Sequence, residues 1–438
     1  MKNLSVQDLS KCLSKSCSSL THDEASGGES EYIDHKKIHN QAIQAAAIYR
    51  EDEFVWVSEA EVVDYTNRIA RTGVPGPHVK NIGRWFYKAF LRDARQTRDM
   101  AAHSQKKIGK FGMRIVSDAV LNSRIRQLAT QKKNVEKQEI YCVRQGVEVR
   151  IALSEIWNTA EKRAAKHYVR TIGLEKYCRA QGLSGYFLTT TLPSKFHSNP
   201  SIGRNSWAGL TPRDGHDEMQ NRSRNFQRRF GKTIGVRVEE QHSDGCIHWH
   251  SLIWIEQSRA EKMSKLMERY FGAAPATKIV PIDLAKGSAA TYLMKYLFKA
   301  TGAQYANIDE VTSDTTSLAD AHRATWGGRG VEIFDIPGSS TMWDEFRRIK
   351  IGSKQYEQLI DDGRDLHESA LNNDYCKFLL KLNEINFTGK RTCKIFYEKL
   401  ETGTSVLKGL VVGDELITTH EKTWKIREKR KSEADTYA

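Results

Sequence analysis

Alternating apolar and β-branched positions predict three strands in the middle of the chain. They cover residues 186–192, 234–240 and 248–255, and Pro193 ends the first of them. The second and third flank Ser243-Asp244-Gly245, in which Asp-Gly favours a tight hairpin turn. We therefore expect an antiparallel pair of strands at this point, inside a larger sheet.

Helical spacing dominates on both sides of these strands. Trp85, Phe86, Ala89 and Phe90 recur at helical intervals within a basic stretch, 78–140, and a further helix is expected over 284–300 before Gly302. Weaker helical patches lie at 43–49 and 59–70, and short strands are expected at 394–397 and 405–410. The mixture predicts an α+β fold, a central antiparallel sheet with flanking helices.

Breaker residues and composition suggest four regions. Gly73-Val74-Pro75-Gly76-Pro77 marks the first boundary. We expect a partly disordered N-terminal region over 1–77, with a Ser-rich start, and a basic helical region over 78–150. The core would occupy 151–302. Residues 303–438 would form a small α/β C-terminal region with a basic tail at 422–431.

Charge and cysteine usage narrow the class of protein. The 438 residues carry a net charge of +14, which suits a polyanionic partner, although a merely soluble basic protein would show the same excess. The seven cysteines are irregularly spaced without a CxxC pair, which indicates a reducing compartment and argues against disulfides and a cysteine zinc site. We find no signal peptide and no run of 18 apolar residues, so no membrane association is expected.

The segment 240–250 carries the first candidate chemistry. On a strand, His248 and His250 project from one side while Trp249 points to the other. The hairpin returns the preceding strand alongside, so Glu240 can add a carboxylate, and this mixed donor set suits Mg²⁺ or Mn²⁺. His242 either supports a ligand from behind or replaces Glu240. The alternative is two histidines on a solvent-exposed face with Trp249 in the core. It accounts less well for the tight hairpin and for Glu240 on the neighbouring strand.

The helix over 284–300 carries the second candidate group. At helical spacing Tyr292, Lys295, Tyr296 and Lys299 form one stripe, and Leu293, Met294, Leu297 and Phe298 lie opposite, where they can pack on the sheet. A phenol can attack a phosphodiester if its proton is removed and the phosphate charge is offset. Alternatively, this is a structural helix with tyrosines at a wet boundary. The repeated Tyr-x-x-Lys spacing favours the catalytic interpretation.

These motifs resemble those of the HUH endonucleases (histidine, hydrophobic residue, histidine) and, among them, the bacteriophage replication gene A endonucleases. Residues 187–193 resemble the first motif, 240–250 the second and 292–299 the third, in its two-tyrosine form. The proline usual before the first motif histidine is Ile247 here. Weaker similarity extends to 85–136 upstream, and to 323–327, 334–338 and 417–426 downstream.

The resemblance implies an HUH fold and a rolling-circle replication initiator. Such an enzyme nicks single-stranded DNA at an origin, keeps the 5′ end on a tyrosine, releases a 3′-OH, and later rejoins the displaced strand. Thr189 and Thr191 of the first motif would contact DNA. The order of the tyrosines stays open, with Tyr292 favoured as the primary or equal partner. The resemblance also implies a phage or prophage protein acting in the cytoplasm of a bacterial host.

Other partners follow from what the sequence lacks. Gly231-Lys232-Thr233 is not a phosphate loop because position 226 is Phe226, so we expect no nucleotide cofactor and a host helicase and polymerase. A group of arginines just before the histidine hairpin would grip the DNA backbone or form a solvated helix face: Arg222, Arg224, Arg228 and Arg229.

Two other functions compete with this interpretation. One is a relaxase or transposase of the same superfamily, but relaxases usually place three histidines after an N-terminal tyrosine, whereas here the tyrosines follow the histidines. Transposases of this kind are usually shorter, with one tyrosine. The other is a basic DNA-binding regulator without catalysis, which would leave the histidine strand and the Tyr-x-x-Lys repeat as coincidences.

Overall fold

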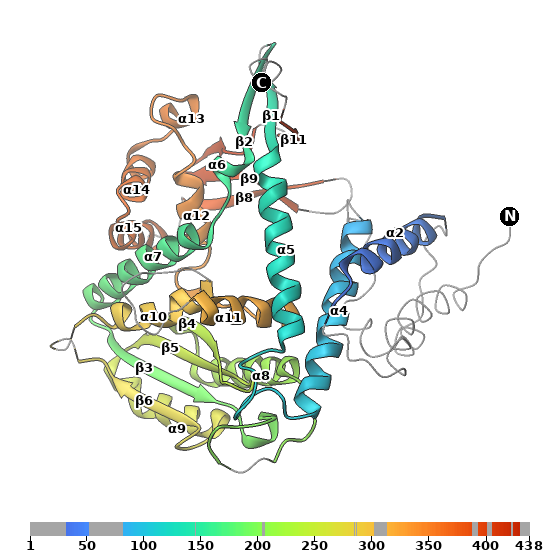
Figure 1. The fold of residues 1–438 in the computed structure, drawn as a ribbon. Helices are drawn as coiled ribbons and strands as arrows, with labels where there is room; N and C mark the ends of the chain where they lie inside the picture. Colours follow the sequence, from blue (N-terminus) through green and yellow to red (C-terminus); the bar gives the residue numbers. More distant parts are fainter. Residues whose placement is uncertain are drawn as a thin grey trace.

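The computed structural model describes most of the chain and has a five-stranded antiparallel sheet at its centre. The described residues are 32–51, 82–144, 146–203, 206–283, 285, 287–301, 313–387, 393–400, 405–421 and 424–429. The sheet has the strand order β6-β3-β5-β4-β7 (Figure 1). Its strands are β3 (Ser184–Thr191), β4 (Ile234–Gln241), β5 (Ile247–Ile255), β6 (Thr277–Pro281) and β7 (Val331–Phe334).

The three predicted strands and their hairpin are confirmed. They correspond to β3, β4 and β5, and the Asp-Gly turn joins β4 to β5 with Gly245 at a φ of +76°. The mixture of helices with antiparallel strands also confirms the α+β class. β6 and β7 extend the sheet at its two edges.

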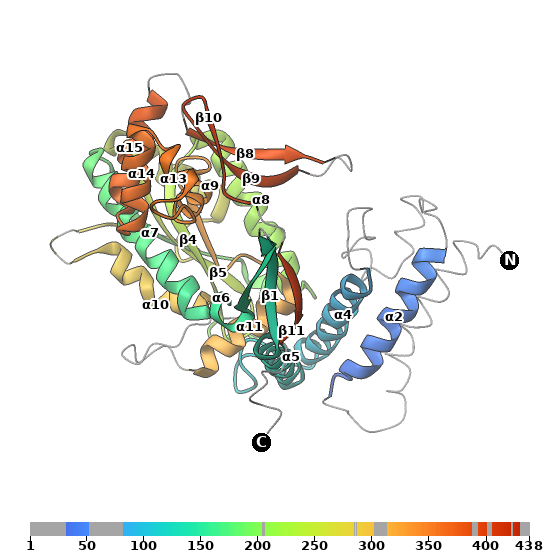
Figure 2. The ribbon, with the colours of Figure 1, turned by 90° about the horizontal axis from the view of Figure 1, so that it is seen from above.

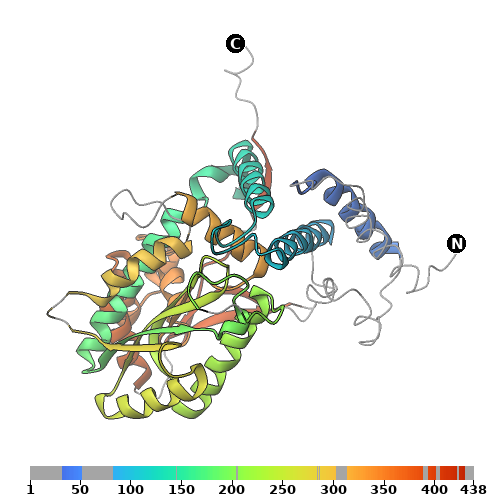
Figure 3. The ribbon, with the colours of Figure 1, turned by 60° about the horizontal axis from the view of Figure 1, so that its bottom comes forward.

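Helices cover both faces of this sheet (Figure 3). On one face α8 (Pro212–Phe230) and α9 (Ala260–Phe271) pack over a core that includes Met219, Trp249 and Met263. On the other face lie α7 (Ala160–Ala180) and α10 (Ala289–Thr301), with Leu174, Val238 and Leu293 in a shared core. Helices α8 and α10 therefore lie on opposite faces of the sheet.

The basic helical region contains helices and an unexpected hairpin. α4 (Ile82–Ser104) packs on α2 (His35–Glu51) through an apolar cluster that includes Phe86 and Phe90, and the pair stands to one side of the sheet domain (Figure 2). α5 (Asp118–Lys137) then leads into β1 (Gln138–Arg144) and β2 (Val147–Ala152). Residues 138–150 are thus not helical, because β-branched residues alternate there.

The C-terminal region is mainly helical, with one small antiparallel sheet. Its helices are α11 (Ser313–Trp326), α12 (Ser339–Phe346), α13 (Lys354–Glu357), α14 (Asp361–Leu371) and α15 (Tyr375–Phe387). The sheet, in the order β10-β9-β8, consists of β8 (Cys393–Lys399), β9 (Ser405–Val412) and β10 (Glu415–Thr418), so both strands predicted here are confirmed.

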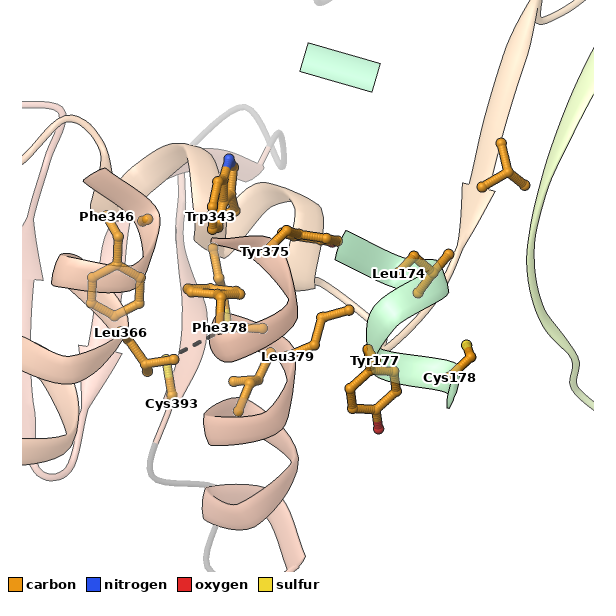
Figure 4. Packing of buried hydrophobic residues seen from close by; sticks show 14 of the residues in the cluster. Leu174, Tyr177, Cys178, Trp343, Phe346, Leu366, Tyr375, Phe378, Leu379 and Cys393 are labelled. Atoms are coloured by element: carbon orange, nitrogen blue, oxygen red, sulfur yellow. Dashed lines mark hydrogen bonds between the residues drawn. The ribbon is translucent and has the colours of Figure 1, made fainter. Parts of the chain in front are cut away.

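The C-terminal helices share one core with the sheet domain. Trp343 and Phe346 of α12 pack against Phe378 of α15, and α7 adds Leu174 to the same cluster (Figure 4). Burial of several large aromatic side chains fixes α7 between the sheet and the C-terminal helices, since each such group contributes about 1.5–3 kcal/mol. α7 therefore has a fixed position from which it can hold α10.

The expected basic tail is in part a strand. Residues Lys425–Glu428 form β11, which pairs antiparallel with β1 to make a sheet of order β11-β1-β2. Residues 422, 423, 430 and 431 of the expected tail lie outside the described residues, as do the helical patch at 59–70, the break at 73–77 and Gly302. None of the described helices is long and apolar enough to cross a membrane.

Candidate active site

The register of the sheet gathers the first group of candidate residues. Glu240 pairs with His248 across β4 and β5, and Thr189 and Thr191 pair with His250 and His248 across β3 and β5. Cross-strand partners lie on the same face of a sheet, so all five side chains project from the face that α10 covers. The hairpin therefore does what the sequence predicts and brings the carboxylate beside the imidazoles.

Three donor atoms meet at one point on this face. The Nε2 atoms of His248 and His250 are 2.8 Å apart, and Oε2 of Glu240 is 3.1 Å from the first and 3.0 Å from the second. Among the described residues, these three form the group whose donor atoms lie close enough to hold one metal ion. Two imidazole nitrogens and a carboxylate oxygen are a suitable donor set for a divalent cation.

The neighbouring strand residues point the other way, as expected. The indole of Trp249 donates to Glu239 at 3.3 Å on the far face, and the Arg237 guanidinium lies 3.6 Å from the centre of the indole ring. Burial raises the pKa of Glu239 to about 7, against the opposing hydrogen bond from Trp249. The alternation of side chains thus separates the histidine cluster from a second buried acidic group.

Helix α10 brings both tyrosines and both lysines to the histidine face. The ring of Tyr296 stacks on that of His250, with centroids 3.8 Å apart and planes inclined by 24°. Lys299 donates to Oε1 of Glu240 at 3.0 Å. The Lys295 ammonium lies 5.2 Å from the ring centre of Tyr292 and 4.9 Å from that of Tyr296. The predicted stripe therefore lies over the predicted cluster.

The two tyrosines occupy different environments. Tyr296 is buried, with 9% of its surface exposed, whereas Tyr292 is 53% exposed. Tyr292 lies one turn earlier and meets the ring of Phe187 edge-on, with centroids 5.0 Å apart. The tyrosine nearest the histidines is thus the sheltered one.

The apolar residues of α10 do not all pack on the sheet, which corrects the prediction. Leu293 joins the sheet core, but Met294, Leu297 and Phe298 form a cluster with Ala164 of α7. Because α7 packs against the apolar side of α10, the tyrosine stripe of α10 faces the sheet. The helix also begins at Ala289, later than the expected residue 284.

A buried glutamate fixes the start of α10. Glu175 of α7 accepts hydrogen bonds from the hydroxyl of Ser288 at 2.6 Å and from the backbone amides of Ala290 at 3.1 Å and Ala289 at 3.3 Å. A carboxylate satisfies the free amides of a helix N-terminus and complements its dipole. Sequence reasoning missed Glu175, because this contact joins residues more than a hundred positions apart.

The charges of the cluster support an ionised carboxylate. Burial opposes ionisation of Glu240, but hydrogen bonds from His248 and His250 and the charge of Lys299 outweigh it and hold its pKa well below the usual value. Burial, aided by the charge of His248, lowers the pKa of His250. An ionised carboxylate is the protonation state in which this side chain binds a cation.

His242 lies next to the cluster and outside it. It follows the end of β4, and its ring centroid is 4.3 Å from that of His248. Burial and the charges of His248 and His197 lower its pKa to about 3. Glu240, which pairs directly with His248, completes the triangle of donor atoms, and His242 is not among the three.

The turn after His242 is held by residues that the sequence did not single out. Asp244 accepts from Nδ1 of His197 at 3.0 Å and from the amide of Cys246 at 3.2 Å. Gly245 sits close to Ile115, whose carbonyl oxygen would be 2.7 Å from an added Cβ. An Asp-Gly pair signals the turn, but nothing local in the sequence points to His197.

The two threonines and the four arginines are placed differently. The Thr189 hydroxyl is 3.2 Å from Nδ1 of His250, and Thr191 shares its face. The arginines lie on α8, on the opposite side of the sheet, where Arg222 pairs with Glu218. The structure does not bring these arginines to the cluster, and their contact with DNA stays a prediction. The residues concerned are Arg222, Arg224, Arg228 and Arg229.

The fold and the site define a class: an α+β protein whose antiparallel sheet presents two histidines and a glutamate beneath a helix of paired tyrosines and lysines. The chain belongs to the bacteriophage replication gene A protein family, whose family model matches residues 81–304, just over half of its length. This match includes β3, the histidine hairpin and α10.

Individual relatives share part of the chain. It is 29% identical over 231 residues to the replication protein of Haemophilus phage HP1, covering 48% of this chain and 29% of the relative. It is 30% identical over 212 residues to the replication gene A protein of Escherichia phage 186, covering 43% and 30%. A probable replication endonuclease from a prophage-like region of Salmonella paratyphi A is 29% identical over 195 residues, covering 38% and 24%.

These relatives are much longer than the shared segment. The matched part spans less than half of each of the three proteins. No solved structure matches the chain.

Proposed function

We propose that this protein is a phage replication initiator that nicks single-stranded DNA at a replication origin, with a tyrosine of α10 as the nucleophile. The observation that carries the proposal is the position of Tyr296, whose ring lies on His250 of the donor triangle. The relatives are named replication proteins and a replication endonuclease, which supports the same activity. The order of the motifs supports an HUH fold.

Glu240, His248 and His250 would hold a divalent cation. Their donor atoms lie 2.8, 3.0 and 3.1 Å from one another, close enough to share one ion. Two imidazole nitrogens and a carboxylate oxygen form a mixed donor set that suits Mg²⁺ or Mn²⁺. Such an ion, when bound, polarises a phosphoryl oxygen.

The reaction we propose is a transesterification. The tyrosine oxygen loses its proton and bonds to phosphorus, the bond from phosphorus to the 3′ oxygen breaks, and that oxygen takes up a proton to become the free 3′-OH. The strand keeps its 5′ phosphate on the tyrosine. The ammonium of Lys295, close to both phenol rings, offsets the negative charge of the phosphate.

The two tyrosines suit two successive cleavages. In contrast to the sequence-based preference for Tyr292, Tyr296, beside His250, would cut first, and the more exposed Tyr292 would cut the regenerated origin. The first 3′-OH is extended by a host polymerase, a host helicase separates the strands, and the displaced strand is closed by reversal of the chemistry. The protein would act in the cytoplasm of the bacterial host.

The test is the formation of a covalent adduct. The full chain is incubated with a labelled single-stranded oligonucleotide of the phage origin and Mn²⁺, and the linked peptide is identified by mass spectrometry. We expect one first adduct, on Tyr296, that is absent without metal and absent in the double variant Tyr292→Phe/Tyr296→Phe. Binding of the oligonucleotide without an adduct would favour a regulator without catalysis and overturn the proposal.

A further inference from the structure

Two neighbouring histidines each have a buried nitrogen without a hydrogen bond. Within the described residues, Nδ1 of His248 and Nε2 of His242 are both buried and lack a partner. The two rings are adjacent, with centroids 4.3 Å apart and planes inclined by 43°. Buried polar atoms of this kind are uncommon and cost about 1–3 kcal/mol each, so such a pair calls for an explanation.

Cation binding would determine what these nitrogens need. Nε2 of His248 lies in the donor triangle, so an imidazole that gives this atom to a cation carries its proton on Nδ1. That N–H then requires an acceptor, because metal-bound histidines nearly always donate their other nitrogen to a neighbouring group. The adjacent unpartnered nitrogen is Nε2 of His242, which accepts when the proton of His242 is on its Nδ1.

We propose that His242 is a positioning residue that accepts the Nδ1–H of His248 and so orients this ligand toward the cation. The inference rests on the cation site of the proposed function and adds the residue that orients one of its ligands. A hydrogen bond between these two nitrogens would give each of the unpartnered atoms a partner, and the rings that carry them are 4.3 Å apart between centroids.

The second histidine of the triangle already has such a partner. Nδ1 of His250 is 3.2 Å from the hydroxyl of Thr189 on the adjacent strand. With His242 behind His248, both imidazoles would have their outer nitrogens engaged. The two partners come from different elements, Thr189 from β3 and His242 from the turn after β4.

His242 is itself held by the same turn. The ring of His197 meets it edge-on, with centroids 5.1 Å apart, and Nδ1 of His197 donates to the buried Asp244 at 3.0 Å. Asp244 also accepts from the amide of Cys246, just before β5 begins. Asp244, held by the hairpin backbone, therefore positions His197, and His197 packs against His242, the residue next to His248.

The test is Mn²⁺ affinity measured by calorimetry on the full chain, with no DNA present. We expect His242→Phe, which cannot accept a hydrogen bond, to raise the Kd about 10–100-fold. His242→Gln, whose amide oxygen can accept, should stay within a few fold of wild type. The matched control is His216→Gln on α8, a histidine on the opposite face of the sheet whose nitrogens lie 3.7 Å from Asp217 and from Glu239, and it should leave the Kd unchanged.

The stability of each variant is compared by thermal unfolding with and without Mn²⁺. We expect the rise in Tm on adding Mn²⁺ to shrink in His242→Phe and to persist in His242→Gln. If the Phe variant does not fold, His242→Ala replaces it in the same comparison. A Kd within twofold of wild type for the variant without an acceptor overturns this inference alone.

The cation site itself is tested by separate variants. His250→Ala should abolish Mn²⁺ binding, since it removes one of the three donors. If wild type fails to bind Mn²⁺, or His250→Ala binds it normally, the cation site of the proposed function is wrong and this inference falls with it. Failure of the cation site is therefore seen in wild type or in His250→Ala, whereas failure of the His242 inference alone is seen in His242→Phe.

Discussion

Tyr296 and His250 lie face to face, with ring centroids 3.8 Å apart, although they belong to a helix and a strand 46 positions apart in the chain. The contact depends on the register of β5, which turns His250 toward α10, and on α7, which covers the other side of the helix. It stacks the ring of Tyr296 on one member of the histidine cluster, and among the described residues Tyr292 has no such contact with the cluster. The two tyrosines are therefore expected to have different roles.

The two single tyrosine variants should therefore differ. Tyr296→Phe keeps the stacked ring but lacks the nucleophile beside the cluster, so the first adduct should fall at least about a hundredfold. Tyr292→Phe should form that adduct at a near-normal rate and fail in joining the displaced strand. Single-turnover assays on an origin oligonucleotide measure both steps. Equal loss of the first adduct in the two variants would contradict this assignment.

Lys299→Met tests the charge beside Glu240. The ammonium pairs with Oε1 of Glu240 at 3.0 Å, so its removal leaves a more negative donor set. We expect Mn²⁺ binding to tighten by up to about tenfold while adduct formation slows, because the phosphate loses a counter-charge. Calorimetry and the adduct assay check the two effects. Lys299→Arg is the control, and weaker Mn²⁺ binding in the Met variant would refute the expectation.

Glu175→Ala should loosen the start of α10. The substitution leaves the Ser288 hydroxyl and two backbone amides without their acceptor, which we expect to cost about 1–2 kcal/mol in the free energy of unfolding. Urea unfolding measures this cost, and the adduct assay should show a slower reaction. Lys176→Ala, at an exposed position next to it on α7, should change neither. Equal stability of the two variants would count against the capping role.

The buried Glu239 should make stability depend on pH. Because burial raises its pKa to about 7 from an ordinary 4.5, the folded protein keeps a proton that the unfolded chain has released. The resulting stabilisation is complete below pH 4.5 and is lost as the pH rises to about 7. Glu239→Gln lacks this ionisation. We therefore expect its free energy of unfolding, relative to that of wild type, to rise by up to about 3 kcal/mol as the pH increases from 4.5 to 7, measured by urea unfolding.

The control for this prediction is Glu415→Gln, at an exposed position in β10. It should shift stability equally at low and high pH. A Glu239→Gln variant with the same pH dependence as wild type would show that another group carries the effect.

The sequence predicted the centre of the site because strong local patterns encode it. An Asp-Gly turn sets the register of β4 and β5, and this register alone brings Glu240 to His248. The stripe on α10 follows from helical spacing. How α10 lies on the sheet does not, since the packing of Leu297 and Phe298 on α7 depends on residues far away in the chain.

Other contacts had no local signal. Glu175 and His197 act on segments distant in sequence, and a lone glutamate or histidine has no spacing that marks it. The β1–β2 hairpin was hidden because its strands continue directly from α5 within a basic stretch. The arginines of α8 illustrate the converse: neighbours in sequence to the histidine hairpin, they lie across the sheet from it.

The pairing of β11 with β1 has a consequence for how the chain is made. During synthesis Gln138–Tyr141 leave the ribosome long before Lys425–Glu428, which later cover that edge. Until then the hairpin exposes a row of open backbone donors and acceptors, a surface on which other chains can add. A protein shortened before residue 425 would keep this edge open permanently and should self-associate, whatever the state of its distant histidines.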